Sequence, residues 1–303
     1  LSRPRNLSVE VNGDIFHNLH LFANPIDKFR PSDKEIQRAL KKKKGSNLIY
    51  FGPGVHNLPN DTLFVPSGTT VYIDGGARVY GNIFTEGAHD VNIFGRGEVH
   101  PDGRGAGVWV RRSKNVRIDG IVVSQLPIGQ CDSVELTNVK SISYYGWGDG
   151  MDVFSSSNVI LDGVFCRNSD DCAAVYASTQ GFKGGSNNVL VKNATLWADV
   201  AHPINIGGHG DPNGMDTVQN VTFRNIDILD QAEKQIDYQG CLAINPGDNT
   251  LVRNITFENI RIEDFRNGQL VNFRISFNPK YCVSTGRGIQ NVLVKDVTYN
   301  GSG

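Results

Sequence analysis

The sequence predicts an all-β fold, a right-handed parallel β-helix, and three observations support this. A short phrase of alternating apolar residues, mostly preceded by Asn, recurs along most of the 303 residues. The intervals between the phrases carry no helical pattern, and glycine, with 34 residues, exceeds its usual share of roughly 7%. One strand phrase in every ~20–35 residues, without helices between, is typical of a β-solenoid.

Nine phrases make up the repeat, and each has a characteristic first apolar residue. These residues are Val71, Val91, Val116, Val134, Val159, Val189, Val221, Ile255 and Val292. Their spacing grows from 18 residues, between Val116 and Val134, to 37 residues, between Ile255 and Val292, which indicates longer loops toward the C-terminus. Because one coil cannot bury its own apolar face, we expect stacked coils to align these residues in one core. Asn and Gly suit the corners because they tolerate a left-handed backbone.

For the N-terminal segment, residues 1–30, the sequence pattern predicts a β-hairpin. Residues 7–11 and 14–22 alternate in polarity, and Asn12-Gly13 between them is a preferred two-residue hairpin turn. A lone hairpin is not a stable domain. We therefore expect it to dock on the main body or to belong to a small β module.

Residues 31–45 predict one helix. Ser32 and Glu35 have the spacing of a capping box, and the lysines at 41–44 suit the negative end of the helix dipole. We interpret these lysines as a solvated helix end rather than a polyanion site. The helix is expected to cap the first coil of a β-helix catalytic domain that spans residues 46–303, because an uncovered end would expose unpaired strand edges.

Composition argues against several classes of protein. Thirty Lys and Arg balance 31 Asp and Glu, so the chain lacks the basic surface that a nucleic-acid partner requires. No apolar run approaches the ~18–20 residues of a membrane span. The five cysteines form no Cys-x-x-Cys pair, so we expect no metal site and no cofactor. Since the chain begins at Leu1 rather than Met, a leader could have been removed, and we expect a secreted or periplasmic monomer.

Two acidic segments depart from the repeat. Asp149 and Asp152 lie in Gly-Asp-Gly-Met-Asp-Val, and Asp170 and Asp171 follow in Ser-Asp-Asp-Cys-Ala-Ala-Val. Asp149 and Asp170 are 21 residues apart, about one coil, so the two segments are expected to stack. Carboxylates this close repel one another, so at least one should keep its proton to higher pH, as general acid–base catalysis requires. Calcium binding and a purely structural corner role are the alternatives.

The next coil carries His202, in His-Pro-Ile-Asn-Ile-Gly, and His209, in Gly-His-Gly. Either histidine could tune the pKa of the acid or bind substrate, whereas a hydrogen bond to local backbone is the structural alternative. Trp147, just before the acidic coil, could stack on a sugar ring or pack as an aromatic corner of the solenoid.

These motifs, in this order, resemble those of glycoside hydrolase family 28, the polygalacturonases. The family pattern is Asn-Thr-Asp-Gly-x-Asp, then Gly-Asp-Asp-Cys-x-Ala, then Gly-His-Gly-x-Ser-Ile-Gly, then Arg-x-Lys. The resemblance implies Asp170 as the general acid, Asp149 and Asp171 as the groups that activate water, and His202 as the family histidine. It also implies inversion of configuration, although a one-coil spacing of carboxyls is nearer the ~5 Å of retaining enzymes than the ~6.5–9.5 Å of inverting ones.

The sequence departs from the family pattern at two points. Trp147 and the following glycine replace Asn-Thr, and Arg-x-Lys, which binds the substrate carboxylate in the family, is missing. Ala243 stands in the place of the arginine and Asn245 in that of the lysine. Either Arg274 or Lys280 therefore supplies the cation from a later loop, or the substrate is a neutral glycan, as in the dextranase-like β-helix hydrolases.

We accordingly expect a glycoside hydrolase that cleaves a polysaccharide or oligosaccharide, pectic or neutral, by carboxylate catalysis. The expected catalytic residues are Asp149, Asp170, Asp171 and His202, and the expected substrate-binding residues are Trp147, Asp152, His209, Asn245, Arg274 and Lys280. A non-catalytic glycan-binding solenoid, which needs no carboxylate cluster, is one alternative. A uronate lyase or epimerase, which needs a basic proton abstractor and a charge neutraliser, is the other.

Overall fold

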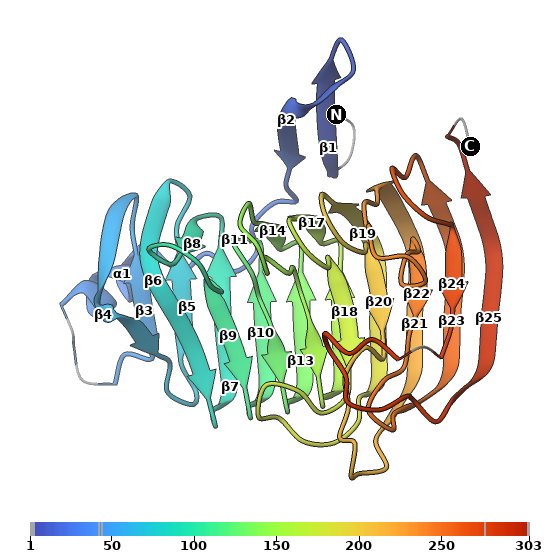
Figure 1. Cartoon of the computed structure of the whole chain (residues 1–303). Coiled ribbons are helices and arrows are strands. Elements are labelled where there is room, and N and C mark those ends of the chain that lie inside the picture. Colours follow the sequence, from blue (N-terminus) through green and yellow to red (C-terminus); the bar gives the residue numbers. More distant parts are fainter. Residues whose placement is uncertain (1–3, 42, 44, 276, 302–303) are drawn as a thin grey trace.

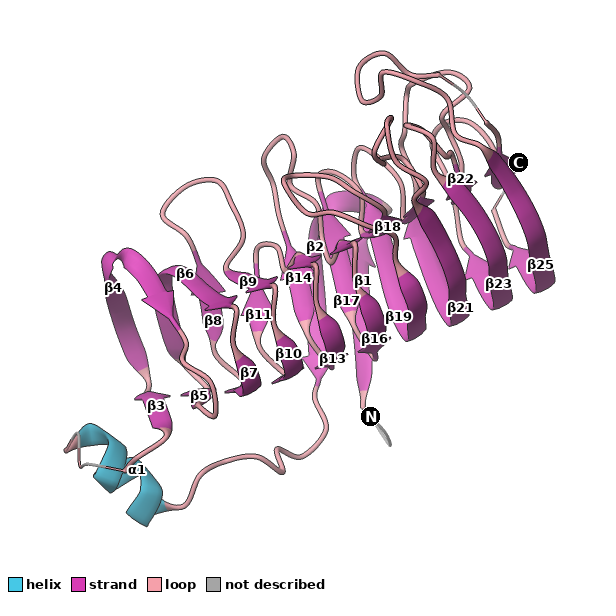
Figure 2. Cartoon of the chain, turned by 90° about the horizontal axis from the view of Figure 1, so that it is seen from below, coloured by secondary structure: helices cyan, strands magenta, loops and turns pink. Residues whose placement is uncertain are grey.

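A computed structural model describes residues 4–41, 43, 45–275 and 277–301, and it confirms the right-handed parallel β-helix (Figure 1). Lys42 and Lys44 of the lysine run, and the last two residues of the 46–303 segment, lie outside the described residues. Within the described residues, no helix is long and apolar enough to cross a membrane. In the described part of the chain, 23 strands form one sheet, which winds into three faces (Figure 2).

The first face carries the sequence repeat. Its strands are β3 (Leu48–Phe51), β5 (Thr70–Ile73), β7 (His89–Gly95), β10 (Lys114–Asp119), β13 (Asp132–Thr137) and β16 (Ser157–Asp162). Val91, Val116 and Val134 are register partners in adjacent coils and are fully buried. Val71 instead pairs with Ile93, two residues beyond Val91, so the predicted register of the first interval is wrong.

The second face lies next to the first along the chain. Its strands are β4 (Gly54–Phe64), β6 (Ala77–Glu86), β8 (Glu98–His100), β11 (Val122–Val123), β14 (Lys140–Ile142) and β17 (Phe165–Asn168). Further on, single long strands continue through both faces, namely β19 (Asn187–Ala198), β21 (Thr217–Asp230), β23 (Leu251–Ile262) and β25 (Gly288–Tyr299).

The third face is built from short strands. They are β9 (Val108–Arg111), β12 (Ile128–Gly129), β15 (Val153–Phe154), β18 (Ala173–Tyr176), β20 (Ile204–Ile206), β22 (Leu242–Ile244) and β24 (Val271–Phe273). The loops beside the later strands are long and gather on one side of the rod (Figure 2). These loops and this face carry the candidate site.

Asparagine stacks at a corner of the coils, as predicted. Asn158 and Asn188 have φ angles of 57° and 56°, a left-handed backbone that Asn tolerates. The Asn188 amide donates to the Asn158 side chain (2.7 Å), and the Asn158 amide donates to Asp132 (2.6 Å). Each corner side chain is thus bonded to the coil before it, which helps to hold the coils in register.

The predicted helix is present but shorter than residues 31–45. It is α1 (Asp33–Leu40), and its capping box is confirmed, since the Ser32 amide donates to Glu35 Oε2 (2.8 Å) and the Glu35 amide to Ser32 Oγ (3.4 Å). Ile36 is its buried residue. The helix lies next to β3 at the N-terminal end of the rod (Figure 2).

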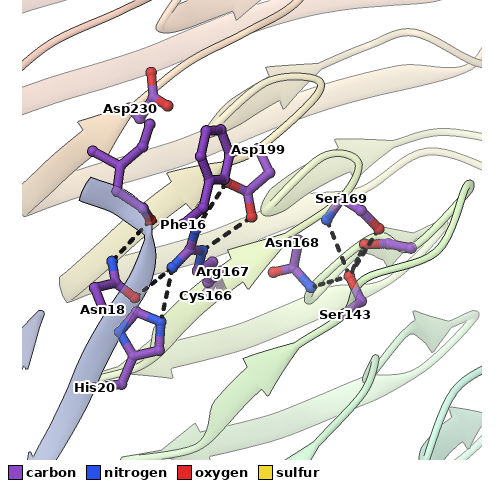
Figure 3. A network of polar contacts seen from close by, with 12 residues as sticks. Phe16, Asn18, His20, Ser143, Cys166, Arg167, Asn168, Ser169, Asp199 and Asp230 are labelled. Atoms are coloured by element: carbon purple, nitrogen blue, oxygen red, sulfur yellow. Dashed lines mark hydrogen bonds and ion pairs between the residues drawn. The ribbon is translucent and has the colours of Figure 1, made fainter.

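The predicted hairpin forms from β1 (Arg5–Val11) and β2 (Asp14–Ala23), which pair antiparallel through a turn at Asn12 and Gly13. It lies against the second face near β14 and β17, and not at the first coil (Figure 1). Arg167 makes much of the contact, because its guanidinium donates to Asn18 (2.8 Å) and to the backbone oxygen of Ile15 (2.8 Å) while pairing with Asp199 (Figure 3).

Candidate active site

A cavity of about 240 Å³ lies on the third face, over β15, β18 and β20. Seven of the ten predicted site residues line it, namely Trp147, Asp149, Asp152, Asp170, Asp171, His202 and His209. They come from loops before and after three successive strands, so the stacking of coils brings them together from 63 residues of sequence, from position 147 to 209.

Asp149 and Asp170 lie in neighbouring coils, as their spacing predicts. The strands that follow them, β15 and β18, are paired in parallel, and the Gly150 amide donates to the backbone oxygen of Asp171 (2.7 Å). The carboxyl groups of Asp149 and Asp170 share a hydrogen bond. The carboxyl cluster therefore consists of a contacting pair with Asp171 beside it.

The glycines on either side of Asp149 permit this close approach. A Cβ atom on Gly148 would lie 2.3 Å from Ser169 Oγ, and one on Gly150 would lie 2.2 Å from the backbone oxygen of Cys172. Both distances are far inside van der Waals contact, so any larger residue would displace the Asp149 backbone. The Gly-Asp-Gly sequence is thus required by packing between coils.

Polar side chains behind the pair fix its backbone. The Asn168 amide donates to Ser143 Oγ (3.0 Å) and to the backbone oxygen of Asp149 (3.1 Å), and the Ser169 amide donates to Ser143 Oγ (3.1 Å). Figure 3 shows Ser143, Asn168 and Ser169 side by side at the ends of two adjacent coils. This network orients Asp149 without entering the cavity.

Both carboxyls of the pair bind protons more tightly than an ordinary aspartate. Burial, followed by the charges of Asp170 and Asp171, raises the pKa of Asp149 well above its usual value. Burial, followed by the charge of Asp171, raises the pKa of Asp170 to about 6. Since contacting carboxylates do not ionise together readily, the pair keeps one proton at mildly acidic pH. It can then offer one acid and one base.

Asp171, in contrast, is a charged group with both oxygens occupied. Oδ1 accepts from the His202 amide (3.0 Å) and pairs with His202 Nδ1 (2.8 Å), while Oδ2 accepts from Tyr176 Oη (2.6 Å) and Asn205 Nδ2 (2.8 Å). Burial alone would raise the pKa of Asp171, but His202 and these hydrogen bonds lower it to about 2. A carboxylate stabilised in this way is a weak base.

His202 is buried and both of its ring nitrogens are engaged. Nδ1 lies 2.8 Å from Asp171 Oδ1, and Nε2 lies 2.5 Å from the backbone oxygen of Tyr238. Both partners are acceptors, so both nitrogens carry protons and the ring is an imidazolium. Burial alone would lower the pKa of His202, but the Asp171 charge and these hydrogen bonds raise it. The ring therefore positions Asp171 and has no free nitrogen for substrate.

Asp152 and His209 offer polar atoms to the cavity. Asp152 is buried, and its Oδ1 has no hydrogen-bond partner among the described residues. Burial, followed by the charge of Asp149, raises the pKa of Asp152 well above its usual value. Burial also lowers the pKa of His209, whose ring packs edge-on against Tyr176 at 4.9 Å.

The rim of the cavity combines aromatic rings with a cation. Lys280 Nζ lies 5.0 Å from the ring centre of Trp147 and 4.8 Å from that of Tyr281. A hydrogen bond with Tyr281 raises the pKa of Lys280, and the negative charges of Glu233 and Asp170 add to this effect. Trp147 has a φ of 61°, a strained value for a bulky residue, and it is exposed.

The three remaining predicted binding residues do not line this cavity: Lys280 packs on its rim residues Trp147 and Tyr281, and Asn245 and Arg274 lie elsewhere. Asn245 is buried, and neither of its amide atoms has a hydrogen-bond partner in the described part of the chain. Arg274 pairs with Asp237 (2.5 Å) and lines a separate hollow with Ile236 and Pro279. Of the two candidate cations, Lys280 therefore lies at the rim of the cavity with the carboxyl pair, and Arg274 lies in a different place.

Sequence reasoning missed five residues of the site, namely Tyr176, Asn205, Glu233, Tyr238 and Tyr281. Asn205 had a detectable signal, because it is a polar residue between Ile204 and Ile206 and so points away from the core. The loops with Glu233, Tyr238 and Tyr281 have no periodicity, so no pattern places them over the site. For the calcium alternative, the residues that the structure describes contain no group of three or more His, Cys, Asp or Glu side chains arranged to hold a metal.

The sequence profile and the individual relatives found by comparison with known proteins agree with one another. The sequence profile described as Glycosyl hydrolases family 28 matches residues 97–302, over two thirds of the chain. A polygalacturonase of Juniperus ashei is 26% identical over 298 residues, which cover 86% of this chain and 54% of that protein. An exopolygalacturonase of Cochliobolus carbonum is 24% identical over 246 residues, covering 70% and 52%. The chain spans about half the length of the curated relatives it matches.

Solved structures show the same fold at low sequence identity. A family 28 exopolygalacturonase of Yersinia enterocolitica superposes with a TM-score of 0.67 at 15% identity, covering 94% of this chain and 68% of that one. An endo-xylogalacturonan hydrolase of Aspergillus tubingensis superposes with a TM-score of 0.51 at 15% identity, covering 88% of each chain.

Proposed function

Because the chain belongs to glycosyl hydrolase family 28, we propose that it hydrolyses glycosidic bonds of a pectic polysaccharide, with Asp149 and Asp170 as its acid–base pair. One observation supports this assignment above the others. Two carboxyls that are hydrogen-bonded to each other line a cavity, and burial raises the pKa of both, that of Asp170 to about 6. We further propose that the protein is a secreted or periplasmic monomer, as relatives named polygalacturonases and the sequence suggest.

Asp170 donates its proton to the glycosidic oxygen as the bond to the sugar breaks. The hydrogen bond between the two carboxyls raises the pKa of Asp149 and lowers that of Asp170, so the shared proton passes from Asp149 to Asp170 for this step. Asp149, then ionised, takes a proton from the water that attacks the sugar carbon. Asp171 stays ionised and is too weak a base for that step, so its role is to hold His202 and to keep a negative charge next to the acid. This differs from the expectation that Asp149 and Asp171 both activate water. Inversion, which the family resemblance implies, remains a prediction.

Lys280 provides the cation that an acidic sugar needs. The places of the family arginine and lysine hold Ala243 and Asn245, and Arg274 is bound to Asp237. Without a cation, the acidic cavity would repel a uronate carboxylate. The Lys280 ammonium, held at the rim over two aromatic rings, can pair with that carboxylate. Trp147 can stack on a sugar ring, and Asp152 and His209 can bind its hydroxyls.

The proposal is tested with a panel of polygalacturonan, xylogalacturonan, dextran and other neutral glucans, measuring release of reducing ends. We expect hydrolysis of a uronate polymer, with loss of at least about 100-fold in Asp170→Asn, as for removal of a general acid. Asp90→Asn, an isosteric change at an exposed residue of β7, should match wild type. Binding without turnover would support a glycan-binding solenoid, and unsaturated products would support a lyase.

A further inference from the structure

A loop after β24 crosses back over the candidate site. Residues 277–282, here called the strap, lie against loops of two earlier coils. The Asn278 amide donates to Gln235 Oε1 (3.3 Å), the Gln235 amide donates to Tyr281 Oη (3.2 Å), and Cys282 Sγ donates to the backbone oxygen of Gly208 (3.1 Å). In Figure 1 this red loop reaches from β24 back toward β18. The strap is therefore fixed by bonds to both coils.

The strap meets the opposite wall of the site. Trp147 belongs to the loop before β15, whereas the strap follows β24, four coils further along the rod. The rings of Trp147 and Tyr281 are 6.3 Å apart and nearly perpendicular, and Lys280 packs on both. Rings at this separation are in edge-to-face contact, so a sugar ring does not fit between them.

The cavity beneath this contact is small and bounded on several sides. Its volume of about 240 Å³ is below the roughly 300–1,000 Å³ typical of pockets for drug-sized ligands. Tyr281 also stacks on Tyr238 at 5.8 Å and meets His209 edge-on at 6.2 Å, so packed aromatic rings form the strap side of the cavity. Asp149 and Asp170 line this same cavity. A chain that reaches them has to place a terminus in it.

We propose that the contact between the strap and Trp147 makes this protein an exo-acting hydrolase, which accepts the end of a glycan chain and excludes its interior. This inference rests on the proposed function and adds the mode of attack. The strap also sets Lys280 at the rim, so the same element that blocks the groove supplies the cation for the terminal uronate.

The test follows the products and the viscosity of polygalacturonan during hydrolysis by wild-type protein. We expect mono- or disaccharide from the earliest time point, with viscosity nearly unchanged while a few per cent of bonds are cleaved. Galacturonate oligomers blocked at the reducing end or at the non-reducing end extend the test, and blocking one of the two ends should abolish turnover. A rapid fall in viscosity, or equal cleavage of free and blocked oligomers, would overturn the exo assignment.

Variants then test whether the strap causes this selectivity. Trp147→Ala combined with Tyr281→Ala removes the contact and should give intermediate-sized products and cleave blocked oligomers. Tyr144→Ala, which removes an exposed neighbouring ring outside the cavity, should keep the wild-type product pattern. If the double variant keeps that pattern while folding normally by thermal melting, the strap is not the cause. If it does not fold, the blocked oligomers still decide the mode for the wild-type protein.

The outcomes separate this inference from the proposed function. Cleavage within the chain by wild type, abolished in Asp170→Asn, would overturn only the exo assignment. Absence of hydrolysis with every uronate and neutral glycan would overturn both.

Discussion

His202 Nδ1 lies 2.8 Å from Asp171 Oδ1, and this buried pair connects one coil of the β-helix to the next. The pair lies directly behind the acid–base carboxyls. It keeps one negative charge beside Asp170, which is one reason why Asp170 holds its proton up to a pKa of about 6. The electrostatics of the catalytic pair therefore depend on a histidine that has no free nitrogen for substrate.

Replacing His202 with Gln should destabilise the protein, because it leaves the Asp171 charge buried without its cation. Breaking a buried pair by removing one partner costs about 3–5 kcal/mol. The Asp171 pKa is depressed, so its stabilisation is present above the unfolded value of about 3.9 and is lost as pH falls toward 2. Urea unfolding of wild type should show this acid loss, and H202Q should show less of it. Equal stability of the two proteins would contradict the ion pair.

Asp170→Asn should make the protein more stable than wild type near neutral pH. Folding raises the Asp170 pKa to about 6, so above that pH an unfavourable charge is present in the folded wild-type protein. The variant carries no such charge. Unfolding free energies should therefore diverge as pH rises from about 4 to 7 and converge below about 4. A difference that is independent of pH would show that the Asp170 carboxyl is not perturbed.

The activity of the wild-type protein should decline as pH falls below about 6, because Asp170, with a pKa of about 6, then adds a second proton to the carboxyl pair. The reaction needs one proton on the pair, and because the pKa of Asp149 is raised further than that of Asp170, the pair loses this proton only at a higher pH. The acid limb belongs to the carboxyl pair as a whole, since protonation of both groups removes the base. A profile of kcat/KM against pH measures both limbs. Activity that does not fall below about pH 6 would contradict the assignment.

Lys280→Gln should lower kcat/KM for a uronate substrate by about 10- to 100-fold, the range for hydrogen bonds to a charged group. The effect should appear mainly in KM if the lysine binds ground state and transition state alike. Lys183→Gln, which removes an exposed lysine paired with Asp211, is the matched control and should have no effect. Equal losses on uronate and neutral oligomers would indicate that Lys280 acts through its aromatic neighbours.

Gly148→Ala should reduce activity while leaving the fold intact. Its Cβ atom would lie 2.3 Å from Ser169 Oγ and 2.6 Å from the backbone oxygen of Tyr145, so the backbone that presents Asp149 must shift. Gly146→Ala is the matched control, because nothing lies within 4 Å of its Cβ position. Circular dichroism checks the fold, and reducing-end release checks activity. Full activity of G148A would show that the position of Asp149 tolerates this shift.

The sequence predicted the coil register because aligned apolar residues must bury one another. Val116 and Val134 could be paired on that ground. Asp149 and Asp170 could be placed in neighbouring coils by their spacing of 21 residues, close to the 22-residue offset between β15 and β18. The sequence wrongly aligned Val71 with Val91, the first apolar residue of the next phrase. The register partner of Val71 is Ile93, two residues further on, because the interval between these two coils is longer than the interval between the phrases.

The rest of the site depends on how long loops fold, and periodicity carries no information about this. Tyr281 reaches Trp147 across several coils through a loop whose path is fixed by bonds to Gln235 and Gly208. The sequence offered Arg274 and Lys280 as equivalent cations. The structure distinguishes them, because Arg274 pairs with Asp237 in a separate hollow and Lys280 packs on Trp147 and Tyr281.

The central claim is that Asp149 and Asp170 act as one unit that shares a proton. It is tested most directly by kcat/KM for reducing-end release by Asp149→Asn, Asp170→Asn and the double variant, on the substrate that wild type cleaves best. We expect each single variant to lose at least about 100-fold and the double variant to lose little more, because residues that act as a unit are not additive. Losses that multiply in the double variant, or a single variant with near-normal activity, would contradict the claim.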